Sequence, residues 1–106
     1  MFAVLSDIHA NLEALQAVLA DMQAHGAGEA VSLGDIVGFN GSPAECVELV
    51  RPHLAAAGLG NHEAAMFDAA VFGVPMYISM IDTTRGMLTA KQAEWLHGLP
   101  LTAVHR

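Results

Sequence analysis

The sequence predicts an α/β fold built on a parallel sheet of strand–helix units. Three short apolar runs, at residues 2–6, 30–33 and 54–59, have the length of buried strands. A segment with helical spacing or a helix-start signal follows each run, so the order is strand then helix, three times over. Such alternation is typical of parallel sheets, because parallel strands need a crossover connection.

The first two helices are predicted from cap residues and from apolar spacing. Asn11 is a suitable N-cap and Gly26 a suitable end for a helix whose apolar residues recur at helical spacing, namely Leu12, Leu15, Leu19 and Met22. Ser42, Pro43 and Glu45 form an N-cap, first-turn proline and capping-box acid for the second helix. That helix should stop near residue 51, since a proline follows.

The C-terminal third has weaker signals. We expect a helix over residues 64–72 and another from the capping box Thr89–Gln92 through residue 96. Residues 101–104 are expected to begin one more strand. Four methionines are expected to fill gaps in the core: Met66, Met76, Met80 and Met87.

Composition limits the class of protein. Hydrophobic residues make up 54% and charged residues 14% of the 106 residues, which suits one folded domain. The formal net charge of −7 makes nucleic acid an unsuitable partner. No apolar run is long enough to span a membrane, and we expect no signal peptide. The single cysteine, Cys46, reads as a small buried hydrophobe and fits a cytoplasmic protein.

Three groups of polar residues follow the three predicted strands. Asp7 and His9 follow the first, Asp35 follows the second behind a glycine, and Asn61 and His62 follow the third. In parallel sheets, ligands bind beyond the carboxyl ends of the strands. Each fragment alone is commonplace, since a turn or a helix cap would explain it. Together they predict a metal site whose nitrogen and oxygen donors suit Mn, Fe, Co, Ni or Zn.

The motifs Ser6-Asp7-Ile8-His9, Leu33-Gly34-Asp35 and Leu59-Gly60-Asn61-His62-Glu63 resemble those of the calcineurin-like metallophosphoesterase superfamily. Residues 35–39 and 88–100 are similar to its small prokaryotic phosphodiesterase and phosphatase branch. The resemblance covers nearly the whole chain, and the ordered motif set is specific. It implies the first half of the family's αββα sandwich.

The resemblance also implies a role for each motif residue. Asp7 and His9 would bind a first metal, Asp35 would bridge two metals, and Asn61 would bind the second. His62 would be the catalytic acid or charge-stabilising group, with Glu63 orienting it. The implied cofactors are two divalent transition metal ions, with Mn favoured, and the implied partner is a small phosphorylated substrate.

Two features depart from the family pattern. Leu59 stands where the family often has an arginine before Gly-Asn-His, and no Gly-His or Gly-His-x-His motif follows later in the chain. We therefore expect an N-terminal portion of a single domain, C-terminally incomplete over residues 1–106. We also expect a homo-oligomer in which residues 76–106 pack on a neighbouring copy, because exposed sheet edges invite pairing.

Two functions remain open at this point. The first is metal-dependent hydrolysis of a phosphomonoester or phosphodiester, and the alternative is a catalytically inactive metal-binding or structural α/β module. A nucleotide-binding domain is disfavoured because no glycine-rich loop follows the first strand. The remaining basic and histidine side chains are expected at helix ends, at the surface or at the terminus: His25, His53, Arg85, His97 and His105.

Overall fold

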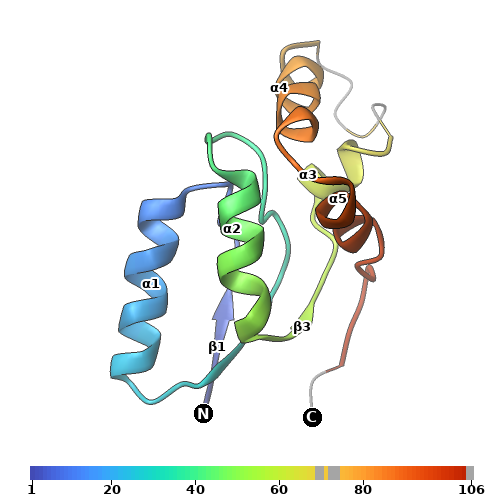
Figure 1. The fold of residues 1–106 in the computed structure, drawn as a ribbon. Coiled ribbons are helices and arrows are strands. Elements are labelled where there is room, and N and C mark those ends of the chain that lie inside the picture. Colours follow the sequence, from blue (N-terminus) through green and yellow to red (C-terminus); the bar gives the residue numbers. More distant parts are fainter. Residues whose placement is uncertain (69–70, 72–74, 105–106) are drawn as a thin grey trace.

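A computed structural model describes residues 1–68, 71 and 75–104. Its sheet has three parallel strands, β1 (Phe2–Leu5), β2 (Glu29–Ser32) and β3 (Leu54–Ala57), in the order β1-β2-β3. All three lie within or one residue from the apolar runs that predicted them. The predicted parallel α/β fold is therefore confirmed (Figure 1).

Two helices cover one face of this sheet. Helix α1 (Leu12–Ala24) connects β1 to β2, and α2 (Pro43–Val50) connects β2 to β3. The helices lie side by side (Figure 1), as two right-handed crossovers in one direction require. Asn11 caps α1 as predicted, its Oδ1 accepting the Ala14 N–H at 3.1 Å. The core lies between these layers and includes Leu5, Leu15, Leu19, Ala30, Cys46, Val47 and Val50.

The opposite face of the sheet carries little cover among the described residues. Side chains alternate along β1, so that Leu5 is buried whereas Phe2 and Val4 are 48% and 58% exposed. Val31 of β2, the register partner of Val4, is half-buried on the same face. This apolar surface, Phe2, Val4 and Val31, is called the open face below.

A short 3₁₀ helix, η1 (Arg51–His53), leads from α2 into β3. Three more helices, α3 (Asn61–Ala65), α4 (Pro75–Gly86) and α5 (Ala90–His97), gather beyond the carboxyl end of β3 (Figure 1). The predicted helix over 64–72 is confirmed only at residues 64 and 65, residues 66–68 are not helical, and residues 69, 70 and 72 lie outside the described residues. The helix starts three residues earlier because Gly60 is its N-cap and Glu63 folds back to accept the Gly60 N–H.

Helix α4 was not predicted. A proline inside a helix would break it, but Pro75 occupies the first helical position, where a proline is tolerated. The Thr89–Gln92 capping box is confirmed and opens α5. The Ser42 N-cap is in place, but its side chain makes no capping hydrogen bond.

The expected strand over 101–104 was also wrong. These residues form no strand, and Leu101 is 83% exposed. A strand needs a hydrogen-bonded neighbour. The Leu59 N–H donates to the Pro100 carbonyl at 2.8 Å, but this bond lies just before residues 101–104.

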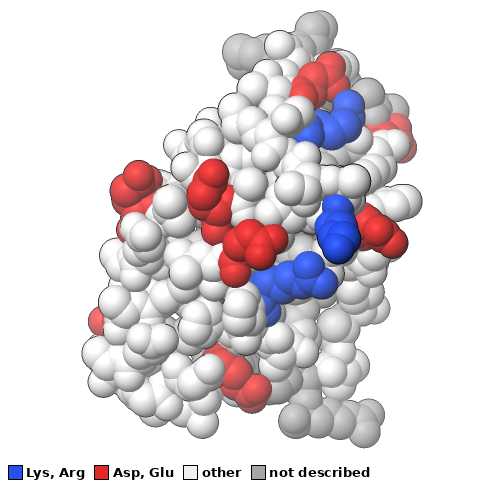
Figure 2. Space-filling view, viewed as in Figure 1, with Lys and Arg blue, Asp and Glu red and all other residues white. Residues whose placement is uncertain are grey.

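Charged side chains are sparse and mixed in sign. On the face shown in Figure 2, each basic group has an acidic group beside it. One such pair is Arg85 with Asp82, whose Nη1 and Oδ1 atoms are 2.9 Å apart, as expected for a surface ion pair. In the described part of the chain, no helix has the length and apolar character needed to cross a membrane.

Candidate metal centre

The loops that follow β1 and β2 are joined by backbone hydrogen bonds. Asp7 N–H donates to the Gly34 carbonyl at 3.2 Å, His9 N–H to Asp35 at 2.9 Å and Ala10 N–H to Ile36 at 2.8 Å. These bonds extend the pairing of the two strands beyond their ends. Residues 26 or 27 positions apart are thereby brought together at the carboxyl edge of the sheet, as predicted.

Asp7 and His9 meet through a tight turn rather than an extended segment. Both have left-handed backbone conformations, with φ of 56° and 50°. His9 Nε2 lies 3.2 Å from Asp7 Oδ1. The two side chains therefore meet although neither residue has the extended backbone of a strand. Left-handed residues that are not glycine are uncommon and cluster at functional sites.

The His9 ring is oriented by a backbone carbonyl. Its Nδ1 lies 3.1 Å from the Val37 oxygen, which can only accept, so Nδ1 carries a proton. In a neutral ring, Nε2 then presents its lone pair to the Asp7 carboxylate. Two acceptors at that distance need a proton or a cation between them. The arrangement matches the way metal-binding histidines are held by a second partner.

Asp35 completes a group of three potential ligands. One ligand atom from each of Asp7, His9 and Asp35 lies within 4.8 Å of the others. Asp35 also has a left-handed backbone, with φ of 57°, and its Oδ1 accepts the His62 N–H at 3.0 Å. The carboxylate is thus fixed between the first two loops and the start of α3.

Asn61 faces the Asp35 carboxylate. The terminal amide atom of Asn61 nearest to Asp35 lies 2.9 Å from Oδ2 and 3.0 Å from Oδ1. Because a carboxylate only accepts, the amide nitrogen of Asn61 lies on this side and donates to Asp35. Asn61 is therefore held against the Asp35 carboxylate by hydrogen bonds.

Glycines allow the loops to approach this closely. A Cβ atom on Gly34 would lie 2.5 Å from Gly60 N, and a Cβ on Gly60 would lie 2.3 Å from Asp35 N. A Cβ on Gly38 would lie 2.0 Å from His62 Nδ1, and Gly38 also has φ of +93°. A larger residue at any of these positions would force the loops apart.

His62 is enclosed by aromatic rings. It is 4% exposed, and its ring centroid lies 4.4 Å from that of His9 and 4.5 Å from that of Phe39. Burial, followed by the neighbouring His9, lowers the His62 pKa, so the ring is neutral at pH 7. The half-exposed ring of Phe39 also packs 4.8 Å from His9. Phe39 ends the stretch 35–39 that resembles the family, but no role was predicted for it, and its φ of 69° is unusual for an aromatic residue.

Glu63 was expected to orient the His62 ring, but its carboxylate contacts backbone groups instead. Its carboxylate is fully buried and accepts three backbone N–H groups: Asp35 at 2.7 Å and Gly60 at 3.1 Å on Oε1, and Val37 at 3.3 Å on Oε2. Burial raises the Glu63 pKa, while the three N–H groups act against that rise.

The Asp7 carboxylate is also supported. Ser6 Oγ donates to its Oδ2 at 2.6 Å, and this bond is the main reason that its pKa is lowered. Asp7 therefore remains ionised, as a metal ligand must be. Ser6 belongs to the motif Ser6-Asp7-Ile8-His9, but no role was predicted for it.

Other candidate residues lie elsewhere. His25 Nδ1 contacts the Asp21 carbonyl at 2.9 Å at the end of α1, and His97 stacks on Phe67 with ring centroids 4.2 Å apart. His53 is half-buried in η1, and His105 lies outside the described residues. Met66 is buried and Met80 packs against the core, but Met87 is exposed, contrary to expectation. The Met76 side chain also lies outside the description.

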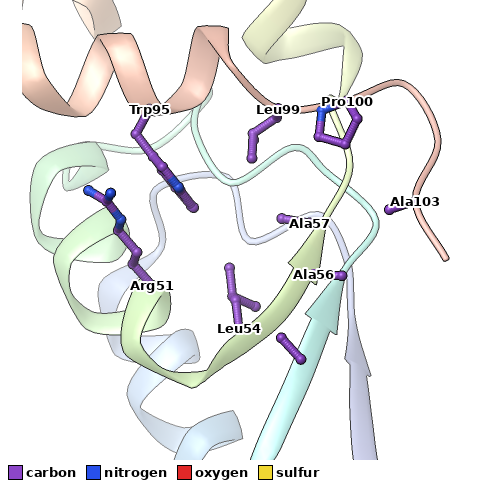
Figure 3. A pocket seen from close by; sticks show the side chains of 9 residues that line it. Arg51, Leu54, Ala56, Ala57, Trp95, Leu99, Pro100 and Ala103 are labelled. Atoms are coloured by element: carbon purple, nitrogen blue, oxygen red, sulfur yellow. The ribbon is translucent and has the colours of Figure 1, made fainter. Parts of the chain in front are cut away.

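A cavity of about 430 Å³ lies beside the outer strand β3, away from this centre. Figure 3 shows Trp95 and Leu99 descending toward it, with Arg51 beside Trp95. The Arg51 guanidinium carbon lies 4.9 Å from the Trp95 ring centroid. Among the described residues that line it, Arg51 is the one with a charge, so they form no set of catalytic groups.

The donor atoms fit a divalent transition metal. Asp7, His9, Asp35 and Asn61 offer carboxylate, imidazole and amide donors, and three of them converge within 4.8 Å. Asp7 lies within hydrogen-bond distance of His9, and Asn61 lies within hydrogen-bond distance of Asp35, so the four side chains form two contacting pairs.

Comparisons with known proteins identify the family of the chain. A family model described as calcineurin-like phosphoesterase matches residues 1–105. A solved metallophosphoesterase from Sphaerobacter thermophilus is 36% identical, with a TM-score of 0.78, and the alignment covers 96% of this chain and 42% of that one. An uncharacterized protein from Methanocaldococcus jannaschii is 52% identical over 63 residues, which are 59% of this chain and 26% of that protein. The chain thus spans less than half of either relative, and it belongs to the calcineurin-like phosphoesterase family.

Proposed function

We propose that the protein hydrolyses a phosphate ester, either a monoester or a diester, at a dinuclear metal site. The observation that carries this proposal is the convergence of Asp7, His9 and Asp35, with Asn61 against Asp35, at the carboxyl edge of a parallel sheet. The family of the chain and its structural neighbour support the same chemistry.

The proposed ligand set divides between two ions. Asp7 and His9 hold the first, Asp35 contacts both, and Asn61 holds the second. Bound divalent metal ions supply positive charge for the phosphate oxygens and lower the pKa of water. Mn²⁺ is the first ion to test, because mixed nitrogen and oxygen donors suit transition metals better than Ca²⁺ or Mg²⁺.

His62 is the proposed catalytic residue. It follows Asn61 directly, and its ring lies 4.4 Å from that of the ligand His9. A neutral imidazole so placed can donate a hydrogen bond to charge that develops on a leaving oxygen. Leu59, where the family often has arginine, provides no second positive group, so His62 and the metals carry this task.

The proposed substrate is a small phosphorylated molecule, and the proposed compartment is the cytoplasm. A cavity of about 310 Å³ has Ser6, Asp7 and Asn11 in its lining together with apolar residues of β1 and α1, so Asp7 is the proposed ligand that it reaches. Charges of mixed sign offer no basic patch to a nucleic-acid backbone on the face shown in Figure 2. The buried free thiol of Cys46 fits a reducing environment.

A second candidate is a metal-binding module without turnover. It is favoured by the ligand count, because the four named donors are few for two ions in open sites, and the chain spans 42% of its structural neighbour. The two candidates differ in one assay: hydrolysis of p-nitrophenyl phosphate and bis-p-nitrophenyl phosphate with added Mn²⁺, on this chain and on a longer version.

His62→Ala is the matched variant for that assay. In an active version it should keep its metals and lose about 10²- to 10⁴-fold in kcat, because proton-transfer and charge-stabilising groups contribute that much. Full activity in the variant would refute the assignment of His62. Metal binding without any hydrolysis, in both the chain and the longer version, would favour the second candidate.

A further inference from the structure

We propose that Glu63 is a positioning residue that assembles the metal centre before any metal binds. This inference rests on the metal site of the proposed function, and it assigns Glu63 to the backbone of the ligand loops rather than to the His62 ring. It predicts that the site is preorganised by one buried carboxylate.

The contacts of Glu63 span two of the three ligand-bearing loops. Oε1 accepts the N–H of Asp35 at 2.7 Å and of Gly60 at 3.1 Å, and Oε2 accepts the N–H of Val37 at 3.3 Å. Asp35 is itself a ligand, and Gly60 directly precedes the ligand Asn61. The Val37 carbonyl, in turn, contacts His9 Nδ1 at 3.1 Å. The Glu63 side chain therefore contacts the backbone of Asp35 and of the residue before Asn61, and it is linked to His9 only through Val37.

The connection between Asp35 and α3 is reciprocal. Asp35 N–H donates to Glu63 Oε1, while Asp35 Oδ1 accepts the N–H of His62, the residue before Glu63. These two bonds close a ring between the β2 loop and the first turn of α3. The ring fixes both the backbone and the carboxylate of the proposed bridging ligand.

Because Glu63 is buried, its carboxylate requires hydrogen-bond donors from the protein. The side chain is 0% exposed, and a buried carboxylate is costly unless hydrogen bonds satisfy it. The three N–H donors provide that compensation, and they come from loops that would otherwise leave these groups without strand partners. A buried acid used only for packing would be replaceable by an apolar residue, whereas these three donors require an acceptor.

The test is metal affinity at equal folding. Co²⁺ is titrated into the unmodified chain, Glu63→Gln and Glu48→Gln, with visible absorption as the readout and circular dichroism as the folding check. Glutamine keeps the length of the side chain but turns an N–H₂ group toward a backbone donor. Glu48 is the matched control, because its Oε1 accepts from Gln92 Nε2 at 2.9 Å far from the ligands.

We expect Glu63→Gln to bind Co²⁺ about 10- to 100-fold more weakly, as for other residues that orient metal ligands, with an altered visible spectrum. Glu48→Gln should leave both unchanged. A folded Glu63→Gln chain with unchanged affinity and spectrum would overturn the proposal. These readouts do not involve hydrolysis, so an inactive protein does not affect the test.

A second measurement on the unmodified chain guards against a variant that does not fold. Without metal, the amide protons of Asp35, Val37 and Gly60 should exchange with solvent together and much more slowly than the amide of exposed Gly41. Addition of Zn²⁺ should change their protection little. Fast exchange of all three in the metal-free protein would overturn the claim that Glu63 organises the loops in advance.

Discussion

The loops at the carboxyl ends of the strands and the segment 99–104 differ sharply in how they are held. Backbone bonds from Asp7, His9 and Ala10, and the three bonds to Glu63, cross between the loops. The segment 99–104, in contrast, has Leu101 and Val104 more than three-quarters exposed at 83% and 78%. Both regions lack regular structure, but the loops are joined to one another by several hydrogen bonds, whereas the bonds of the described segment 99–104 are those of Leu99 and Pro100.

This difference shows where the local sequence is enough to determine the backbone conformation. The loop conformation is imposed by contacts among its own motif residues, including glycines that admit close neighbours and an acid that accepts their N–H groups. The conformation of residues 99–104, in contrast, is fixed by few contacts with the other described residues. Variants in the two regions should therefore have very different effects.

The largest effect on stability is expected for Gly38→Ala. Its Cβ would lie 2.0 Å from His62 Nδ1, and the residue has φ of +93°. Overpacking costs about 1–3 kcal/mol and a left-handed backbone about 1–2 more, so we expect a loss of about 2–5 kcal/mol in the free energy of unfolding. Urea denaturation measures this loss.

The control for that variant is Gly41→Ala, in the same loop, where a Cβ would meet nothing within 4 Å. It should change stability by less than about 0.5 kcal/mol. Equal effects of the two substitutions would show that the loop adapts and that His62 is not held as described.

A smaller effect is expected from the helix cap of α5. Thr89 accepts the Gln92 N–H at 3.1 Å, and Gln92 Oε1 accepts the Thr89 N–H at 3.0 Å. Thr89→Ala should therefore lose about 1 kcal/mol in thermal or urea unfolding. Thr102→Ala, in the exposed segment, is the control and should be neutral. A neutral result for Thr89→Ala would mean that α5 is held by its packing alone.

The buried thiol predicts a pH effect. Burial raises the Cys46 pKa from 9.0 to about 11, so the folded protein keeps its proton after the unfolded chain has lost it. Stability from this group is complete below pH 9 and declines as pH rises towards 11. Unfolding curves across that range should show the decline, and Cys46→Ala should show less of it. The same alkaline decline in both proteins would contradict the assignment to Cys46.

We propose further that the protein self-associates through the open face and the segment 76–106, whose last residues lie outside the description. Exposed apolar side chains on a sheet favour association with another chain. Light scattering after size exclusion should give a dimer or larger species, and Val4→Lys should reduce it. Gln16→Lys, on the exposed side of α1, is the control. A monomer at micromolar concentration would contradict this proposal.

Much of the fold was accessible from sequence. The three strands and α1 were predicted because apolar runs and helical spacing reflect burial on one scaffold. Helix α4 was not predicted because its proline occupies the first position, where a helix tolerates it. The start of α3 was predicted too late, because Gly60 and Glu63 were interpreted only as part of a site and not as a helix start. The strand at 101–104 was wrong because hydrophobicity does not supply a neighbour.

Candidate ligands could be named from the sequence, but the contacts that hold them in place could not. Asp7, His9, Asp35 and Asn61 could be named because they follow consecutive strands. The partners of Glu63 and the position of Phe39 depend on left-handed turns and on contacts between loops. Sequence spacing does not reveal such contacts, and this is why Glu63 was assigned to the wrong neighbour.

The most direct test of the account is calorimetric titration of Mn²⁺ into the chain and into Asp35→Ala. Residues that merely orient ligands typically contribute about 10- to 100-fold in affinity, so removal of the proposed bridging ligand should cost more than about 100-fold. Asp21→Ala, which removes an exposed carboxylate from α1, should bind as the unmodified chain does. Unchanged Mn²⁺ binding in a folded Asp35→Ala chain would contradict the central claim that the strand-end loops form a metal centre.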